Sequence, residues 1–197
     1  MPLERLGFEN SLVTREGRFA QEKSRIAHSA LPIALEADSI FLDEGTTTSV
    51  LAELLRPEKP LTVVTASLPI AVELAARPNI TALCLGGRVR TRTTAVVDHW
   101  ATNMMAELIV DIAFLGTNGI SMGRGLSCPD TGVAAVKTQA IKSARRSVLL
   151  ADHSKFGSDS FAVFAPVTDF TCVITDDATS KSDTDGLKRR GVNVVRA

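Results

Sequence analysis

The stretch FLDEGTTTSVLAELL, residues 41–55, joins an apolar, strand-like run to a helix-like pattern through one glycine and three consecutive threonines. Apolar runs of this kind recur along the chain. They are continuously apolar rather than alternating, which is typical of strands buried on both faces of a sheet. The runs occupy residues 39–43, 61–67, 80–87, 112–116, 147–152, 170–175 and 192–197.

Helix-compatible segments separate these runs. They occupy residues 21–37, 47–55, 68–76, 99–110, 131–144 and 183–190. Alternation of strand and helix predicts an α/β fold with a mostly parallel sheet flanked by helices. Two regions break the alternation: residues 88–100, rich in Thr and Arg, are expected to form a loop or an irregular strand, and the Gly-rich residues 116–132 a long functional loop.

Composition limits the classes of protein to which the chain can belong. Its 197 residues are 45% apolar and 22% charged, which fits one globular domain. A formal net charge of zero argues against nucleic acid as the direct partner of this part of the chain. Because no apolar run approaches the roughly 18 residues of a membrane span, we expect no membrane partner. Three widely spaced cysteines, with no CxxC pair, favour a reducing, cytoplasmic location.

The threonine turn in the opening stretch has two interpretations. Gly45 permits close backbone approach, and the N–H groups of a helix start favour an anion, to which the hydroxyls of Thr46, Thr47 and Thr48 could add donors. Alternatively, one threonine is only the N-cap of a helix, although a cap needs a single hydroxyl. The turn has neither the Lys of a P-loop nor the spacing G-x-G-x-x-G, so it is not a nucleotide fingerprint.

Polar or small residues also end several other strands, and in a parallel sheet ligands bind beyond these carboxyl ends. The strand ends are residues 43–48, 65–67, 86–88, 116–119 and 152–155. Each has an ordinary alternative. Arg88 could be solvated, Asn118 and Gly119 could form a plain turn, and Lys137 could be an exposed helical lysine. The convergence of these strand ends carries more weight than any one of them.

Patterns typical of several enzyme classes are absent. His28, His99 and His153 show no metal-binding spacing, and no G-x-S-x-G elbow precedes a helix. Cys128 lies in the Gly-rich region, but nothing in the sequence marks it as a nucleophile. We therefore predict no catalytic residue, no metal ion and no cofactor.

Several stretches together resemble the C-terminal effector-binding domain of DeoR-family transcriptional repressors. They are EKSRIA (22–27), IFLDEGTTT (40–48), LTVVTASLPIA (61–71), LGGRVR (85–90), DIAFLGTNGIS (111–121), GLSCPD (125–130), VKTQAIKSARRSVLLADHSKFG (136–157) and VITDD (173–177). The resemblance covers about residues 18–197. We therefore expect a sensor domain over residues 19–197, preceded by an arm or linker over residues 1–18.

The resemblance implies a fold similar to ribose-5-phosphate isomerase and the CoA-transferase group. It implies a phosphorylated sugar or related metabolite as effector, with its phosphate at Gly45, Thr46, Thr47 and Thr48. The remaining pocket residues implied are Thr65, Ser67, Gly87, Arg88, Asn118, Gly119, Lys137 and Lys155. It also implies a homodimer or tetramer that reaches DNA only through a separate helix-turn-helix domain.

Two departures from the family pattern touch the expected pocket rim. Ala66 stands where the family usually has Asn, and residues 98–100 stand where it often has Gly. In addition, the 18 or so residues before the match are neither helix-turn-helix-like nor strongly basic. We expect either a sensor domain excised from a longer repressor or a naturally short protein.

A sugar-phosphate isomerase on the same scaffold is the alternative function. Aldose–ketose isomerisation needs a positioned acid and base, usually carboxylates. Residues 116–121 contain no Asp or Glu, and Glu44, the carboxylate beside the turn, is expected to point away from a bound phosphate. The absent acid–base set favours sensing.

Overall fold

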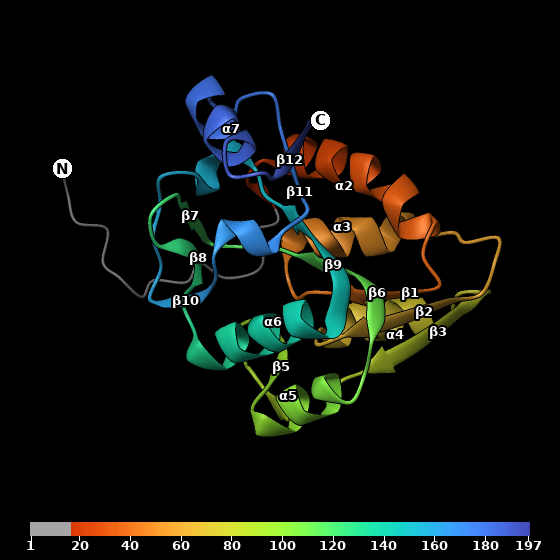
Figure 1. Ribbon diagram of the computed structural model, residues 1–197. Helices are drawn as coiled ribbons and strands as arrows, with labels where there is room; N and C mark the ends of the chain where they lie inside the picture. The colour runs from red at the N-terminus through yellow and green to blue at the C-terminus, as the bar shows by residue number, and fades with distance from the viewer. Residues whose placement is uncertain (1–16) are drawn as a thin grey trace.

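A seven-stranded parallel sheet forms the centre of the protein in the computed structural model, which describes residues 17–197 (Figure 1). Its strands are β1 (Ser39–Leu42), β2 (Leu61–Thr65), β3 (Ile80–Cys84), β6 (Val110–Leu115), β9 (Ala144–Leu150), β11 (Cys172–Thr175) and β12 (Asn193–Arg196). All neighbouring pairs are parallel, in the order β12-β11-β9-β6-β1-β2-β3. The seven apolar runs of the sequence are these seven strands, which confirms the predicted α/β class.

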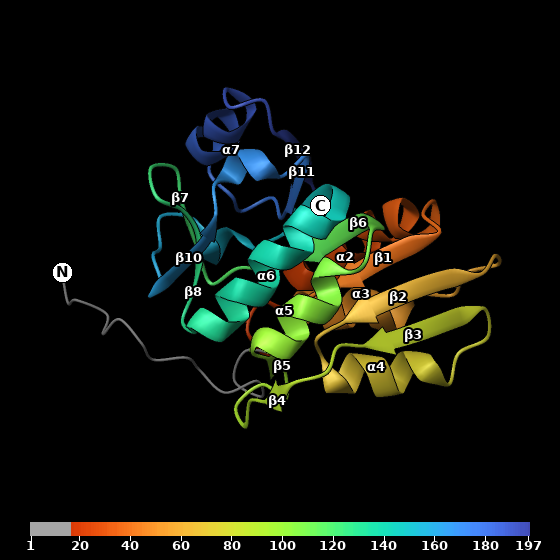
Figure 2. The ribbon, with the colours of Figure 1, turned by 60° about the horizontal axis from the view of Figure 1, so that its bottom comes forward.

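Helices cover both faces of this sheet. They are α2 (Ala20–Leu35), α3 (Thr46–Leu54), α4 (Leu68–Ala75), α5 (His99–Ala106), α6 (Thr131–Ser143) and α7 (Lys181–Lys188). Helices α2, α3 and α4 lie on one face, and α5 and α6 lie together on the other (Figures 1 and 2). Each corresponds to a predicted helical segment. In residues 17–197, no helix has the length and apolar character needed to cross a bilayer.

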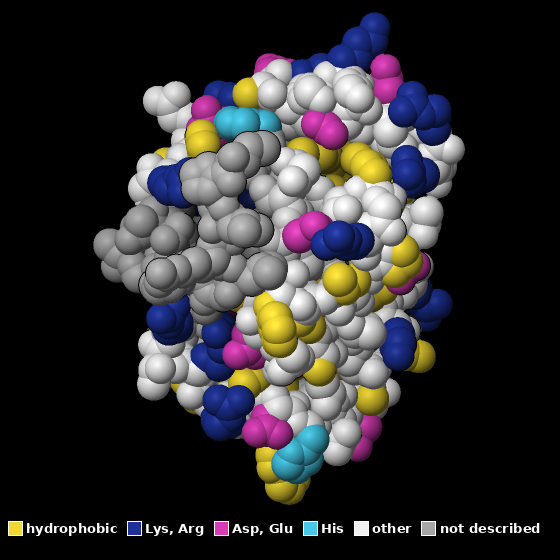
Figure 3. Space-filling view, turned by 90° about the vertical axis from the view of Figure 1, so that its left-hand side faces the viewer, with side chains coloured by type: hydrophobic (Ala, Val, Ile, Leu, Met, Phe, Trp, Pro, Cys, Tyr) yellow, Lys and Arg dark blue, Asp and Glu magenta, His cyan; other side chains and the backbone are white. Residues whose placement is uncertain are grey.

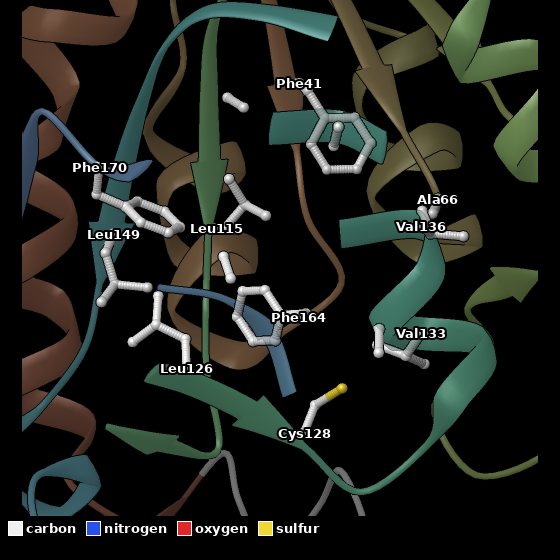
Figure 4. Packing of buried hydrophobic residues seen from close by; sticks show 14 of the residues in the cluster. Phe41, Ala66, Leu115, Leu126, Cys128, Val133, Val136, Leu149, Phe164 and Phe170 are labelled. Atoms are coloured by element: carbon white, nitrogen blue, oxygen red, sulfur yellow. The ribbon is translucent and has the colours of Figure 1, made fainter. Parts of the chain in front are cut away.

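Each face of the sheet has its own apolar core. On the α2–α4 face, Ile26 and Leu51 pack among strand residues such as Ile112. On the other face, Figure 4 shows Phe41, Leu115 and Leu149, from β1, β6 and β9, beside Phe164 and Phe170. Because both faces are covered, successive residues in the central strands are mostly apolar, which is why these strands lack alternation in the sequence.

A second, three-stranded antiparallel sheet lies beyond the main sheet. It consists of β7 (Gly119–Ser121), β8 (Gly125–Cys128) and β10 (Ala162–Ala165), in the order β10-β8-β7. The expectation of one long loop over residues 116–132 is therefore wrong, because β7 and β8 form strands there. Two of the glycines that suggested a loop, Gly119 and Gly125, permit close packing instead. A Cβ atom on Gly119 would lie 2.4 Å from the carbonyl oxygen of Ser158.

The other irregular region, residues 88–100, contains a short hairpin of β4 (Arg88–Val89) and β5 (Val96–Val97), and α5 begins at His99. Two single turns of 3-10 helix, His153–Lys155 and Val167–Asp169, complete the described elements. Of the arm expected over residues 1–18, only the last two residues are described.

The order of the strands determines where a ligand can bind. From β1 the chain adds β2 and β3 on one side, and it later adds β6, β9, β11 and β12 on the other. The direction therefore switches between β1 and β6. In open parallel sheets, the crevice beyond the carboxyl ends at such a switch point is the usual binding site. The threonine turn follows β1, and the segment starting at Gly116 follows β6.

Candidate functional site

The threonine turn forms the start of α3. Gly45 is the N-cap, no side chain caps the helix, and Thr46, Thr47 and Thr48 are its first three residues. The alternative interpretation, in which a threonine is the N-cap of the helix, is therefore wrong. The first helical bond runs from the N–H of Ser49 to the carbonyl of Gly45, 2.9 Å. The three threonine N–H groups precede this bond and make no hydrogen bond within residues 17–197, so they are unused donors at the positive end of the helix dipole.

The three hydroxyl groups of the turn differ in their contacts. The hydroxyl of Thr48 lies 2.7 Å from the carbonyl oxygen of Asp43 and 2.9 Å from that of Gly45, so it donates within the turn and holds its shape. The hydroxyls of Thr46 and Thr47 make no hydrogen bond in the described part of the chain. The turn thus has one hydroxyl that positions the backbone and two that remain able to bind a ligand.

The end of β2 supports the turn from the neighbouring strand. Thr65 is fully buried, and its hydroxyl donates to the carbonyl of Leu42, 2.7 Å away, and accepts from the N–H of Ser67. Ser67 is the N-cap of α4 and accepts from the N–H of Ile70. Both predicted residues therefore lie at the expected sheet edge, where their hydroxyls fix backbone positions.

A buried ion pair joins β1, β6 and α6 at the switch point. The ammonium of Lys137 contacts the carboxylate of Asp43, and these side chains are 3% and 2% exposed. The same ammonium donates to the carbonyl of Gly116, 3.2 Å, and the N–H of Gly116 donates to Asp43, 2.9 Å. Three segments that are distant in sequence are thus held together by one network of charge-assisted hydrogen bonds.

The charge state of Lys137 follows from its surroundings. Burial acts to lower the pKa of its ammonium, but the carboxylates of Asp43 and Glu44 outweigh burial and hold this pKa above its usual value. The ammonium form of Lys137 is therefore favoured beside the threonine turn. Glu44 is itself buried, with 8% of its surface exposed.

The segment after β6 turns sharply into the small sheet. The N–H of Asn118 donates to the carbonyl of Ser127, 3.0 Å, and Thr117 donates to the carbonyls of Gly119 and Ser127. Asn118 and Gly119 therefore lie at the switch point as predicted. Cys128, at the end of β8, is fully buried, and burial raises the pKa of its thiol to about 11, so it is a neutral thiol rather than a nucleophile.

The hairpin places Arg88 and Arg90 differently. Arg88 is exposed and lies 3.7 Å from the carboxylate of Asp98, beside an open groove of about 480 Å³. Gly87, which lines the same groove, has φ +140°, and a Cβ there would lie 2.5 Å from a backbone oxygen. Arg90, not predicted as a site residue, is mostly buried and contacts Asp130 at the start of α6, 3.2 Å. In the sequence, the only indication of a site role for Arg90 is its place in the LGGRVR stretch.

The turn after β9 carries Lys155 and a residue pair that sequence reasoning missed. The ammonium of Lys155 lies 3.8 Å from Asp152. The ring of His153 contacts the buried carboxylate of Asp176 through Nδ1, 2.9 Å. Burial acts to raise the pKa of Asp176, but hydrogen bonds from the N–H groups of His153 and Ala178 and from the imidazole outweigh it and lower this pKa. No spacing in the sequence indicates this pair, because it depends on β9 and β11 being neighbours.

Charge is mixed on the side of the molecule where the small sheet lies (Figure 3). Lys and Arg side chains are spread over the described surface there, with Asp and Glu side chains among them. Such a surface lacks the strong basic excess that binding to nucleic acid requires. Within residues 17–197, no group of three or more His, Cys, Asp or Glu side chains could hold a metal ion.

Relatives of the chain are helix-turn-helix regulators. It is 34% identical to the HTH-type transcriptional regulator FruR of Bacillus subtilis, over 88% of this chain and 69% of that protein. It is 32% identical to the HTH-type transcriptional regulator GlpR of Haloferax volcanii, over 99% of this chain and 76% of that protein.

Among solved structures, RipA from Yersinia pestis aligns with 86% of this chain and 48% of its own, with a TM-score of 0.55 and 15% identity. Ribose 5-phosphate isomerase A from Methanocaldococcus jannaschii aligns with 70% of this chain and 55% of its own, with a TM-score of 0.48 and 18% identity. The chain thus spans about half of the length of these structures, and the likeness to RipA concerns the fold alone.

A family-level match agrees with the relatives. Residues 18–177 match the DeoR C terminal sensor domain. This segment contains the seven-residue stretch from Phe41 to Thr47, the Lys137–Asp43 ion pair and the turn after β9. The chain therefore belongs to the family of DeoR C-terminal sensor domains.

Proposed function

We propose that this sensor domain binds a phosphorylated sugar or a related phosphorylated metabolite at the threonine turn. Binding would modulate DNA binding by a helix-turn-helix region of the full regulator. The observation that carries this proposal is the start of α3. It presents the unused N–H groups of Thr46, Thr47 and Thr48 at the topological switch point of the sheet. A phosphate there would accept these N–H groups and interact with the helix dipole.

The predicted pocket residues divide into two roles in this proposal. Thr46 and Thr47 would donate their hydroxyls to the phosphate, and Lys137, whose charge is paired with Asp43, would hold the turn in position. The hydroxyls of Thr48, Thr65 and Ser67 already hold backbone groups, so they would position the turn. The residues that would line the remainder of the pocket are Gly87, Arg88, Asn118, Gly119 and Lys155.

Packing of α2 suggests how binding would be transmitted. This helix packs along α3, whose first turn forms the phosphate site. Just before α2, the ring of Phe19 meets the ring of His153 edge-on, with their centroids 4.7 Å apart. A ligand that binds one arrangement of α3 and the turn after β9 more tightly would therefore shift α2, which leads toward the N-terminal part of the chain.

Replacing Thr47 with valine tests the phosphate site. The change removes one free hydroxyl but keeps the side-chain shape, so stabilisation by a phosphorylated sugar should be lost while the domain still folds. The measurement is the shift in melting temperature across a panel of sugar phosphates, with the unphosphorylated sugars and inorganic phosphate as comparisons. Thr102→Val, on α5, is the matched control, because its hydroxyl bonds only to helix carbonyls. If a sugar phosphate raised the melting temperature of Thr47→Val as much as that of the wild type, the proposal would be wrong.

The same panel separates the sensor from the alternative isomerase. Any sugar phosphate that stabilises the domain is incubated with it and assayed for its ketose or aldose isomer. The sensor predicts stabilisation without turnover. Turnover at the rates of metabolic enzymes would instead establish the isomerase.

A further inference from the structure

The strand β3 leaves one edge of the main sheet open. It pairs only with β2. The carbonyl of Asn79 and the N–H of Leu85 bond toward β2, and alternate residues of a strand direct their backbone groups to opposite sides. The N–H and C=O groups of Ile80, Ala82 and Cys84 therefore point away from the sheet. Within residues 17–197 these groups make no hydrogen bond.

This edge lacks the usual protection against pairing. Exposed edge strands normally carry a charged residue, a proline or a bulge. The sequence of β3, ITALC, has no charge and no proline, and its register with β2 is regular. The opposite edge, β12, ends in the exposed Arg196. One edge strand of the small sheet, β10, has a register shift between Val163 and Ala165. Only β3 of these three edges is unprotected.

Apolar side chains flank the open edge on one face of the sheet. Figure 2 shows β2 and β3 with no helix in front of them, whereas α6 packs on β6 and β9. On β3, Leu83 is 42% exposed, and on α5, Met104 is 43% and Trp100 is 63% exposed. Met104 continues the surface from β3, because its sulfur lies 3.0 Å from the backbone nitrogen of Gly86. We call β3 with Leu83, Trp100 and Met104 the β3 edge surface.

We propose that the β3 edge surface pairs with the same surface of a second copy of this chain. The two β3 strands would run antiparallel across a two-fold axis and join the two main sheets. With Ala82 opposite Ala82 of the second copy, Ile80 lies opposite Cys84, and each outward N–H meets an outward carbonyl. A two-fold contact brings identical groups together. An uncharged strand suits this contact, since no like charges would face each other.

Substitution of Leu83 by lysine tests this interface. The side chain is partly exposed in the single chain, so the fold should persist. In the dimer, however, two new charges would be buried near the two-fold axis, and the dimer dissociation constant should rise about 100-fold. Sedimentation equilibrium, without ligand, measures the constant. Val163→Lys, an exposed apolar residue on β10, is the matched control and should leave the dimer intact. Circular dichroism verifies that both variants fold.

Hydrogen exchange of the wild-type chain provides a second measurement that needs no variant. The amides of Ile80, Ala82 and Cys84 should gain protection as the protein concentration rises through the dissociation constant. A wild type that is monomeric at every concentration, a Leu83→Lys variant that remains dimeric, or a dimer whose three amides stay unprotected would each overturn the interface. None of these outcomes bears on phosphate binding at the threonine turn.

Discussion

Lys137 shows how the role of a single residue depends on its surroundings. It lies in a helical segment where a lysine is ordinarily solvated, yet it is almost completely buried against Asp43. Its ammonium also faces the ring of Phe164, 5.5 Å from the centroid. Two buried charges of opposite sign are tolerated because each satisfies the other and both bond to the backbone of Gly116. The pair therefore fixes the relative positions of β1, β6 and α6.

Replacement of Lys137 by methionine should destabilise the fold strongly. The carboxylate of Asp43 would then be buried without its counter-ion, which costs about 3–5 kcal/mol of unfolding free energy. Urea denaturation monitored by circular dichroism measures this change. Lys142→Met, on the exposed side of the same helix, should change stability by less than about 0.5 kcal/mol. The double variant Lys137→Met with Asp43→Asn should lose less free energy of unfolding than Lys137→Met alone. Equal losses in the two variants would contradict this account.

At the scale of elements, α6 is fixed at its start by a second long-range contact. Asp130 is the N-cap and accepts from the N–H of Val133, 3.0 Å. The same carboxylate meets Arg90 of the β4–β5 hairpin. The hairpin in turn bonds to the end of β2, through the N–H of Val96 and the carbonyl of Ala66. Asp130 thus connects α6 to the strand end that supports the threonine turn.

Variants of Asp130 should separate its two contacts. Asp130→Ala removes both the cap and the ion pair and should cost about 1–3 kcal/mol of unfolding free energy. Asp130→Asn keeps a capping oxygen and loses the charge, so it should cost about half as much or less, because asparagine caps nearly as well as aspartate. Urea denaturation compares the two. Equal destabilisation by both variants would mean that the charge, rather than the cap, stabilises this end of α6.

For the whole molecule, burial falls from the centre of the main sheet to its edges. Both faces of β1 and β6 are covered, and nearly all their apolar side chains are fully buried, whereas Asn193 and Arg196 of β12 are exposed. The proposed ligand site is at the carboxyl ends of β1 and β6, two central strands, and the proposed contact between copies is at one edge. The phosphate site at the threonine turn and the contact between copies would therefore use different parts of the sheet, whereas Trp100 and Met104 would border both that contact and the groove beside Arg88.

Native-state hydrogen exchange should follow this order. Amides of β1 and β6 should exchange only through global unfolding, while those of β12 should exchange through smaller openings at the edge. The measurement is the denaturant dependence of exchange for individual amides, read by NMR. If the exchange of β1 amides depended only weakly on denaturant, as exchange through local opening does, the centre of the sheet would not be rigid. The proposed site would then not be preorganised.

The sequence by itself determined the class of fold and the positions of the seven main-sheet strands and of the helices. Continuous apolar runs and helical periodicity are local signals, because burial on both faces or on one stripe constrains every residue of an element. The same local signals predicted Gly45 and the threonines of the turn. The resemblance to the DeoR family rested on equally short stretches.

Only the tertiary structure decided which distant segments meet. The pairing of β8 with β10, the contact of Lys137 with Asp43, 94 residues away, and the His153–Asp176 pair all depend on strand order. The hydroxyls of Thr48 and Thr65 likewise bond within the fold, which their residue type does not reveal. Such contacts depend on packing between elements and on the closure of long loops, and neither leaves a periodic trace in one sequence.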